Sequence, residues 1–175
     1  KITQFFQSVI VHRNVEDSDR YFPDPKEDLS RVIALLSEIG TGVDGYRMTE
    51  TEFADDVREA LMAFSSVIAS KNKTRSDFKI PDKLPSIQLS HPSVDGEPVF
   101  FDLDAESMGT KRLLSLLRPA LRVLEQGGIL VIDEIDASLH TKACEAVIAL
   151  FSFSVKNVAG AQLIATTHDT NLLRS

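Results

Sequence analysis

The sequence predicts an α/β fold in which two parallel strands bring a group of polar side chains to one edge of a sheet. Residues 129–132 (ILVI) and 162–166 (QLIAT) are short apolar segments with the length of strands. Between them, residues 141–157 have apolar side chains at helical spacing. A strand, a helix and a second strand form a right-handed crossover, which makes the strands parallel. We expect both strands to be buried, the first on both faces.

Composition is that of an ordinary globular chain. Of 175 residues, 43% are hydrophobic and 26% charged, which is enough for one core. The net charge of −7 argues against a globally basic nucleic-acid surface, although a local basic patch stays open. Cys144 is the single cysteine, so an internal disulfide and a cysteine metal cluster are excluded, and we expect it in the core. The sequence has no transmembrane run and no signal peptide, which predicts a cytoplasmic protein.

Residues 1–80 are expected to form a helical segment appended to an α/β core in residues 81–175. Apolar residues recur at helical spacing in residues 28–39 and in residues 49–69. Gly40 follows the first of these predicted helices and suits a C-terminal cap. Residues before this region are less informative: the first twelve fit a strand or a helix equally well.

Residues 40–47 (GTGVDGYR) match the glycines of a phosphate-binding loop, GxxxxGK[ST], without its chemistry. Tyr46 takes the place of the lysine and Arg47 that of the serine or threonine. A phosphate loop also follows a strand and opens a helix, whereas this segment follows a predicted helix. We therefore expect a turn, and the sequence contains no Walker A motif elsewhere. The first residue is Lys1 rather than methionine, so an upstream portion is expected.

A hairpin and a long helix are predicted next. Residues 81–85 resemble a linker, and residues 86–91 and 98–103 read as strands on either side of an Asp95-Gly96 turn. The D-x-D of Asp102 and Asp104 is reminiscent of a Toprim nuclease, but no glutamate-bearing strand accompanies it.

The long helix starts near Ser107 and runs towards Gln126, and Pro119 is expected to kink or break it. Ser107 and Gly109 lie at its start, where free N–H groups and the helix dipole favour an anion. An ordinary serine N-cap explains Ser107 equally well.

Polar residues follow both predicted strands of the parallel sheet. Asp133 and Glu134 come directly after the first, at the edge where α/β sheets bind ligands. There Asp133 would hold Mg²⁺, and Glu134 would orient and deprotonate an attacking water. His168 follows the second strand, so it is expected at the same edge and in reach of a γ-phosphate. The alternative interpretation of the two acids is a solvated turn.

These motifs, in their order, resemble the C-terminal half of an ABC-type ATPase head. Residues 106–110 (ESMGT) correspond to the signature, 127–136 (GGILVIDEID) to Walker B, 137–140 (ASLH) to the D-loop, and 166–169 (TTHD) to the switch histidine. The fuller wording is similar to the prokaryotic AAA/ABC-like ATPases of abortive infection and anti-phage defence. These are related to the overcoming-lysogenization-defect ATPases and to SMC-type heads. The resemblance covers roughly residue 86 to the end.

The resemblance implies a P-loop NTPase-like, ABC-type parallel sheet half with an appended helical insertion. It implies ATP and Mg²⁺ as cofactors and two heads that sandwich ATP, as a homodimer or higher oligomer. Glu134 and His168 would be catalytic, and Asp133 would bind Mg²⁺. The residues implied to contact nucleotide are Ser107 and Gly109, which would cover the γ-phosphate bound to the partner protomer, with Asp133, Ser138 and His140.

Some positions depart from the family pattern. Glu106 leads the signature, Met108 replaces its first glycine, and His140 replaces the usual D-loop aspartate. Without Walker A, this chain by itself is expected to be inactive.

The functional prediction is an ATP-hydrolysing head in an anti-phage, abortive-infection system. One alternative is a non-catalytic regulatory or scaffold half-module that binds an effector nuclease or nucleic acid. Another is a nuclease with an ATPase head, whose nuclease site would lie in another domain or subunit. No membrane partner is expected.

Overall fold

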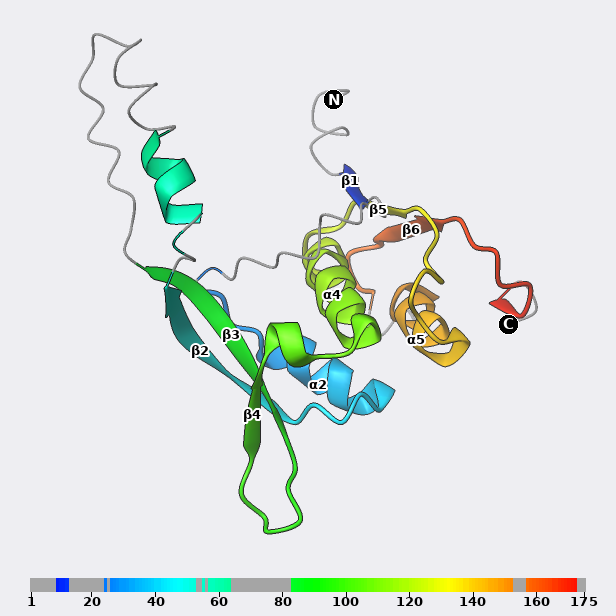
Figure 1. The fold of residues 1–175 in the computed structure, drawn as a ribbon. Helices are drawn as coiled ribbons and strands as arrows, with labels where there is room; N and C mark the ends of the chain where they lie inside the picture. The colour runs from blue at the N-terminus through cyan, green and yellow to red at the C-terminus, as the bar shows by residue number, and fades with distance from the viewer. Residues whose placement is uncertain are drawn as a thin grey trace, which may run out of the picture.

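A computed structural model of the chain describes residues 9–12, 24, 26–52, 55, 57–63, 83–152 and 157–172. Its strands form two sheets, and its longest helix lies between them (Figure 1). The elements in order are β1 (Val9–His12), α2 (Ser30–Ile39), β2 (Gly45–Glu52), β3 (Lys83–His91), β4 (Val99–Asp102), a 3₁₀ turn η2 (Leu103–Ala105), α4 (Met108–Gln126), β5 (Ile129–Ile132), α5 (Thr141–Ser152) and β6 (Gln162–Ala165).

The first sheet is parallel and has the order β1-β5-β6. It confirms the predicted strand at residues 129–132 and its parallel pairing with β6, in which Val131 lies opposite Ile164. It also decides the open choice near the N-terminus, because residues 9–12 form a strand on the other side of β5. The carboxyl ends of β5 and β6 therefore lie at one edge of the sheet.

Burial in this sheet differs from the prediction. Along β5, Leu130 and Ile132 are fully buried, whereas Ile129 and Val131 are only half-buried. The prediction that β6 is buried is wrong among the described residues: Ile164 is 55% exposed. Helices α4 and α5 pack under one face of the sheet (Figure 1), which explains why alternate side chains of β5 are covered.

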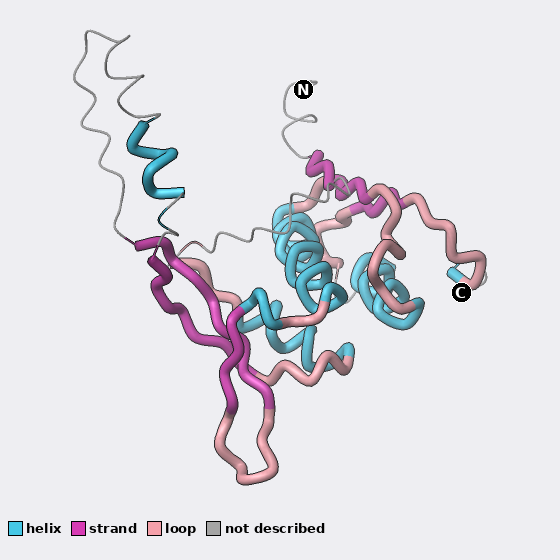
Figure 2. Tube along the Cα trace, in the orientation of Figure 1, coloured by secondary structure: helices cyan, strands magenta, loops and turns pink. Residues whose placement is uncertain are grey.

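The second sheet is antiparallel, with the order β2-β3-β4, and its β3–β4 hairpin projects from the body of the molecule (Figure 2). The predicted hairpin is confirmed, and β3 begins at Lys83, within the predicted linker.

The predicted helix over residues 49–69 is wrong in its first turn, where Gly45–Glu52 forms β2 and Thr49 pairs with Ser86. Residues 57–63 are helical, and residues 53, 54, 56 and 64–69 lie outside the described part of the chain. Strands from residues 1–80 thus enter both sheets, and the domain boundary near residue 80 stays a prediction.

Helix boundaries follow local chemistry. The carboxylate of Asp28 accepts hydrogen bonds from Ser30 at the start of α2, and Gly40 ends that helix in the left-handed conformation at φ 91°, as predicted. Residues 40–44 form the predicted turn, but it leads into a strand rather than a helix. Pro119 does not break α4, which is one helix of 19 residues. Helix α5 is shorter than predicted, because Asn157 is not helical and instead bonds the backbone of Ala161.

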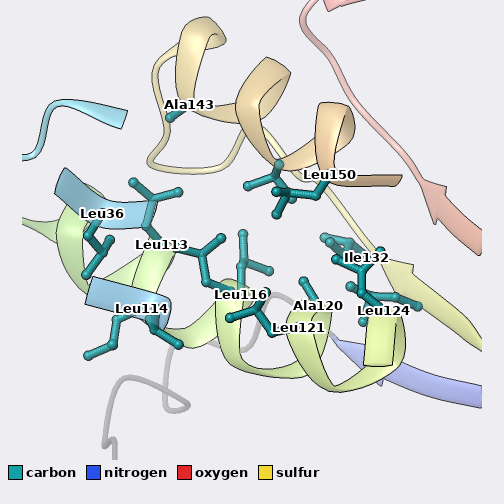
Figure 3. Close-up of a cluster of buried hydrophobic side chains, with 14 of the residues drawn as sticks. Leu36, Leu113, Leu114, Leu116, Ala120, Leu121, Leu124, Ile132, Ala143 and Leu150 are labelled. Carbon is teal, nitrogen blue, oxygen red and sulfur yellow. The ribbon is translucent and has the colours of Figure 1, made fainter. Parts of the chain in front are cut away.

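The core is built around α4. Its apolar face contacts α2, α5 and the parallel sheet, and Figure 3 shows leucines of α4 facing Leu36, Ile132 and Leu150. The completely buried residues of this helix are Leu116, Leu117 and Ala120. Cys144 is also completely buried, as predicted. Burial, helped by the nearby charges of Asp136 and Asp169, raises the pKa of its thiol to about 11.

Candidate functional site

The predicted acid pair and the predicted histidine meet at the edge of the parallel sheet. Glu134 follows β5 and His168 follows β6, and the Glu134 Oε1 to His168 Nε2 distance is 3.4 Å. The two side chains are 47% and 83% exposed, so they face solvent rather than the core. An exposed pair of this kind adds little to stability. Both side chains are therefore accessible to a ligand at this edge.

Thr166, which the sequence interpretation left without a role, ties the acids to β6. Its hydroxyl donates to Asp133 Oδ1 at 2.6 Å and accepts the backbone N–H of Glu134 at 2.8 Å. One side chain therefore orients the carboxylate of one acid and the backbone of the other. The available signal was a hydroxyl on the last residue of the predicted strand over residues 162–166, which was expected to share an edge with Asp133 and Glu134.

The backbone at Glu134 is left-handed, with φ 51°. A non-glycine residue in this conformation costs about 1 to 2 kcal/mol. Hydrogen bonds on both sides hold it there, because the N–H of Glu134 reaches the Thr166 hydroxyl and the N–H of Ile135 reaches the Thr166 carbonyl at 3.0 Å. The turn that presents Glu134 is thus fastened to the end of β6.

Asp136 fixes the backbone of residues 166–169, the predicted switch segment. Its carboxylate accepts the N–H of His168 at 3.2 and 3.3 Å. Burial alone would raise the pKa of Asp136, but hydrogen bonds from the Thr167 side chain and from backbone N–H groups, with the charge of His168, lower it overall. Asp136 is therefore ionised at neutral pH. This positioning role was also missed, although Asp136 is the last residue of the segment predicted to correspond to Walker B.

A second carboxylate links the switch segment to α5. Asp169 accepts a hydrogen bond from the hydroxyl of Thr141, the first residue of α5. That bond, with those from Asn171, lowers the pKa of Asp169 below its ordinary value. The loop after β6 is thus held both by Asp136 and by the start of α5.

The predicted signature residues occupy the start of α4. Ser107 is the N-cap, and its hydroxyl accepts the N–H of Thr110 at 3.0 Å. A Cβ added to Gly109 would lie 3.3 Å from the carbonyl oxygen of Ser138, so the predicted signature and the predicted D-loop touch within this chain. Ser138 is itself left-handed, with φ 60°. The structure shows the capping role of Ser107, and a contact with nucleotide in trans stays a prediction.

His140 begins α5. Its carbonyl accepts the N–H of Ala143 at 2.8 Å, and its ring Nδ1 accepts the N–H of Lys142 at 3.3 Å. The ring is exposed, and its predicted contact with nucleotide is not tested by these bonds. The structure therefore assembles two groups of predicted residues, Asp133 with Glu134 and His168 at the sheet edge, and Ser107 with Gly109 and Ser138 at the start of α4.

The donor set at the sheet edge suits Mg²⁺ that arrives with a nucleotide. Asp133 provides an exposed carboxylate, the type of oxygen ligand that Mg²⁺ prefers. Within the described residues, no group of three or more histidine, cysteine, aspartate or glutamate side chains could hold a metal ion. Mg²⁺ commonly keeps several waters and binds through one or two carboxylates plus phosphate oxygens. Asp133 fits this mode of binding, as a single carboxylate that acts together with phosphate oxygens.

The comparisons with known proteins identify a family for this chain. Residues 44–174, more than half of the chain, match a family model described as AAA domain, putative AbiEii toxin, Type IV TA system. The comparison with curated proteins gives no match. No helix among the described residues has the length and apolarity needed to cross a membrane. The family is of the P-loop ATPase type and generally uses ATP and Mg²⁺. The chain therefore belongs to the AAA domain family of putative AbiEii-type toxins.

Proposed function

We propose that this chain is the signature and Walker B half of an ATP-hydrolysing head that works as an ATP-sandwiched dimer in abortive-infection defence against phage. The observation that carries the proposal is the placement of Glu134 and His168 3.4 Å apart at the carboxyl ends of two paired parallel strands. The family description, which names an AbiEii toxin, supports the defence context.

Each residue at the sheet edge has a chemical role in this proposal. Bound ATP would supply the γ-phosphate, and the Mg²⁺ bound with it would supply the positive charge that polarises this phosphate. Glu134 accepts the proton of the attacking water, and the ring of His168 contacts the γ-phosphate. Asp133 holds Mg²⁺ directly or through water, while Thr166 keeps its carboxylate oriented through the 2.6 Å hydrogen bond.

The phosphate-binding loop has to come from a segment outside this sequence, which has no Walker A motif. Among the described strands, β6 lies at one end of the parallel sheet, and its apolar Ile164 is 55% exposed. We place the missing strand there, because an edge strand with an exposed apolar side chain accepts another strand readily. The chain together with this segment is called the assembled ATPase below.

Dimerisation would use the start of α4. A helix N-terminus binds phosphate through its free N–H groups and its dipole. The hydroxyls of Ser107 and Thr110 lie 2.9 Å apart, so when Thr110 donates, the Ser107 hydroxyl hydrogen is available to a phosphate oxygen. Ser107 and Gly109 would then cover the γ-phosphate held by the partner protomer.

The absent Walker A motif favours one alternative, a non-catalytic half-module that binds an effector nuclease or nucleic acid. The net charge of −7 disfavours the nucleic-acid version. The Glu134 and His168 pair favours hydrolysis, since a scaffold needs neither side chain in this position.

Ser107→Arg in the assembled ATPase tests the proposal. The arginine would occupy the space of the partner's γ-phosphate, so ATP-driven dimerisation, followed by analytical ultracentrifugation, should be lost while ATP binding to the monomer persists. Normal ATP-driven dimers of this variant would contradict the trans role.

A further inference from the structure

A histidine at the end of β3 is joined to the residue that leads into the signature. His91 Nε2 lies 2.8 Å from Glu106 Oε1. The Glu106 side chain is only 6% exposed, and that of His91 is 25% exposed. A carboxylate this deeply buried needs a hydrogen-bonding partner, because an unpaired one would be expensive to desolvate. His91 is such a partner, and it comes from a different part of the fold.

The link to Glu106 matters because Glu106 directly precedes Ser107. The backbone N–H of Glu106 donates to the carbonyl of Leu103 at 3.1 Å, which closes the 3₁₀ turn ahead of the helix. On the other side, the Ser107 hydroxyl accepts the N–H of Thr110, and the Ser107 carbonyl accepts the N–H of Lys111 at 3.0 Å. Hydrogen bonds therefore fix the backbone on both sides of Ser107, and Glu106 makes the one on its N-terminal side.

His91 is itself held in place by the antiparallel sheet. Its ring meets Phe101 of β4 edge-on, with 5.5 Å between ring centroids and an interplanar angle of 73°. A Cβ added to Gly42, in the turn before β2, would lie 3.4 Å from His91 Nδ1, so the backbone passes close to the ring. The ring thus has a fixed position from which to hold Glu106.

We propose that His91 and Glu106 are positioning residues that set the Ser107 hydroxyl for the γ-phosphate bound to the partner protomer. This role rests on the proposed function of Ser107. This pair links the β2-β3-β4 sheet to the predicted signature. Movement of the β3–β4 hairpin would therefore change the position of the Ser107 hydroxyl relative to the nucleotide. Loss of the hydrogen bond to the buried Glu106 carboxylate should weaken ATP-driven dimerisation by about tenfold or more.

Two substitutions separate the hydrogen bond from the ring. His91→Phe keeps a ring against Phe101 and removes the nitrogen that reaches Glu106. His91→Gln removes the ring and keeps an N–H donor. Gln88→Ala is the matched control in the same strand, because Gln88 bonds Arg47 and Asp102 within the sheet.

The first readout is amide hydrogen exchange at Thr110 in the assembled ATPase, since that N–H reports the Ser107 cap. His91→Phe should speed this exchange by about tenfold, the effect of one lost charged hydrogen bond. The second readout is ATP-driven dimerisation, which should weaken by a similar factor while ATP affinity of the monomer stays unchanged. His91→Gln should restore both, and Gln88→Ala should alter neither.

Glu106→Gln examines the same link from the other side and guards against an unfolded His91→Phe protein. It keeps the side-chain shape and weakens the bond, so it should shift both readouts in the same direction as His91→Phe, but by less.

Unchanged Thr110 exchange and dimerisation in both His91→Phe and Glu106→Gln would overturn the proposal, as would equal losses in His91→Phe and His91→Gln. If Ser107→Arg fails to dimerise while His91→Phe dimerises normally, only the positioning role falls. If Ser107→Arg dimerises normally, the trans role falls and the positioning role with it.

Discussion

The hydroxyl of Thr166 donates to the carboxylate of Asp133 across 2.6 Å, from the end of one parallel strand to the end of its neighbour. The same oxygen accepts the N–H of Glu134. Two acids that are adjacent in sequence thus owe their orientation to a residue more than thirty positions later. The candidate site is a property of the sheet edge rather than of either motif alone.

Thr166→Val should therefore damage the site while it preserves side-chain shape. We expect the free energy of unfolding to fall by about 1 to 2 kcal/mol, because a valine leaves the Glu134 N–H without its acceptor. ATP turnover of the assembled ATPase should fall by about tenfold or more through misplacement of the acids. Thr166→Ser, which keeps the hydroxyl, is the control. Equal turnover in the two variants would show that this hydroxyl does not orient the site.

Asp136→Asn should loosen the switch segment in a pH-dependent way. The folded-state pKa of Asp136 is lowered, so its charge stabilises the fold above its ordinary pKa of 3.8, and this contribution is lost as pH falls through the lower native value. At pH 7 the variant should be less stable by about 1 kcal/mol or less, since the site is partly exposed.

The measurement for Asp136→Asn is urea unfolding at pH 7 and at progressively lower pH, with Asp95→Asn in the exposed hairpin turn as the control. The gap between Asp136→Asn and the wild type should narrow as the solution is acidified. A gap that stays constant with pH would mean that the charge of Asp136 is not what stabilises the segment.

Leu116→Ala should be severely destabilising because Leu116 is completely buried in the face of α4 that packs against α2, α5 and the sheet. A buried leucine truncated to alanine costs about 2 to 5 kcal/mol. Met108→Ala on the same helix is the control: Met108 is 52% exposed, and a change of about 0.5 kcal/mol or less is expected. Denaturant unfolding distinguishes these cases, and similar losses for both would contradict the assigned core.

Ile164→Lys should weaken the association of this chain with the segment that supplies the phosphate-binding loop. The charge would be forced into the apolar face of the strand pair that we place at β6. Val158→Lys, at a turn residue that is 85% exposed, should leave the association unchanged. Co-purification and ATP binding by both variants report the outcome. Equal ATP binding would place the missing strand elsewhere.

The parts of the fold that sequence predicted well depend on short-range patterns. The apolar run at residues 129–132, the hairpin about Asp95-Gly96 and the glycine cap at Gly40 were all confirmed. In each, the deciding chemistry lies within a few residues: strand length, turn residues, or a position that needs a positive φ. The proximity of His168 to Glu134 also followed, because parallel strands bring their carboxyl ends to the same edge.

The errors arose where distant residues decide the outcome. Residues 49–52 (TETE) have the threonines and acids of a helix start, yet they pair with β3 and become a strand. The exposure of Ile164 reflects which face of the sheet the helices cover, and no local pattern encodes that. The roles of Thr166, Asp136 and His91 depend on hydrogen bonds between elements that only the folded chain brings together.

The measurement that tests the central claim most directly is ATP turnover by Glu134→Gln in the assembled ATPase. The amide keeps the size of the side chain and cannot accept the proton of the attacking water, so ATP binding should persist while turnover falls by about a hundredfold or more. Glu145→Gln, at an exposed position of α5, should turn over like the wild type. Turnover of Glu134→Gln at the wild-type rate, with ATP still bound, would contradict Glu134 as the base and the hydrolytic function built on it.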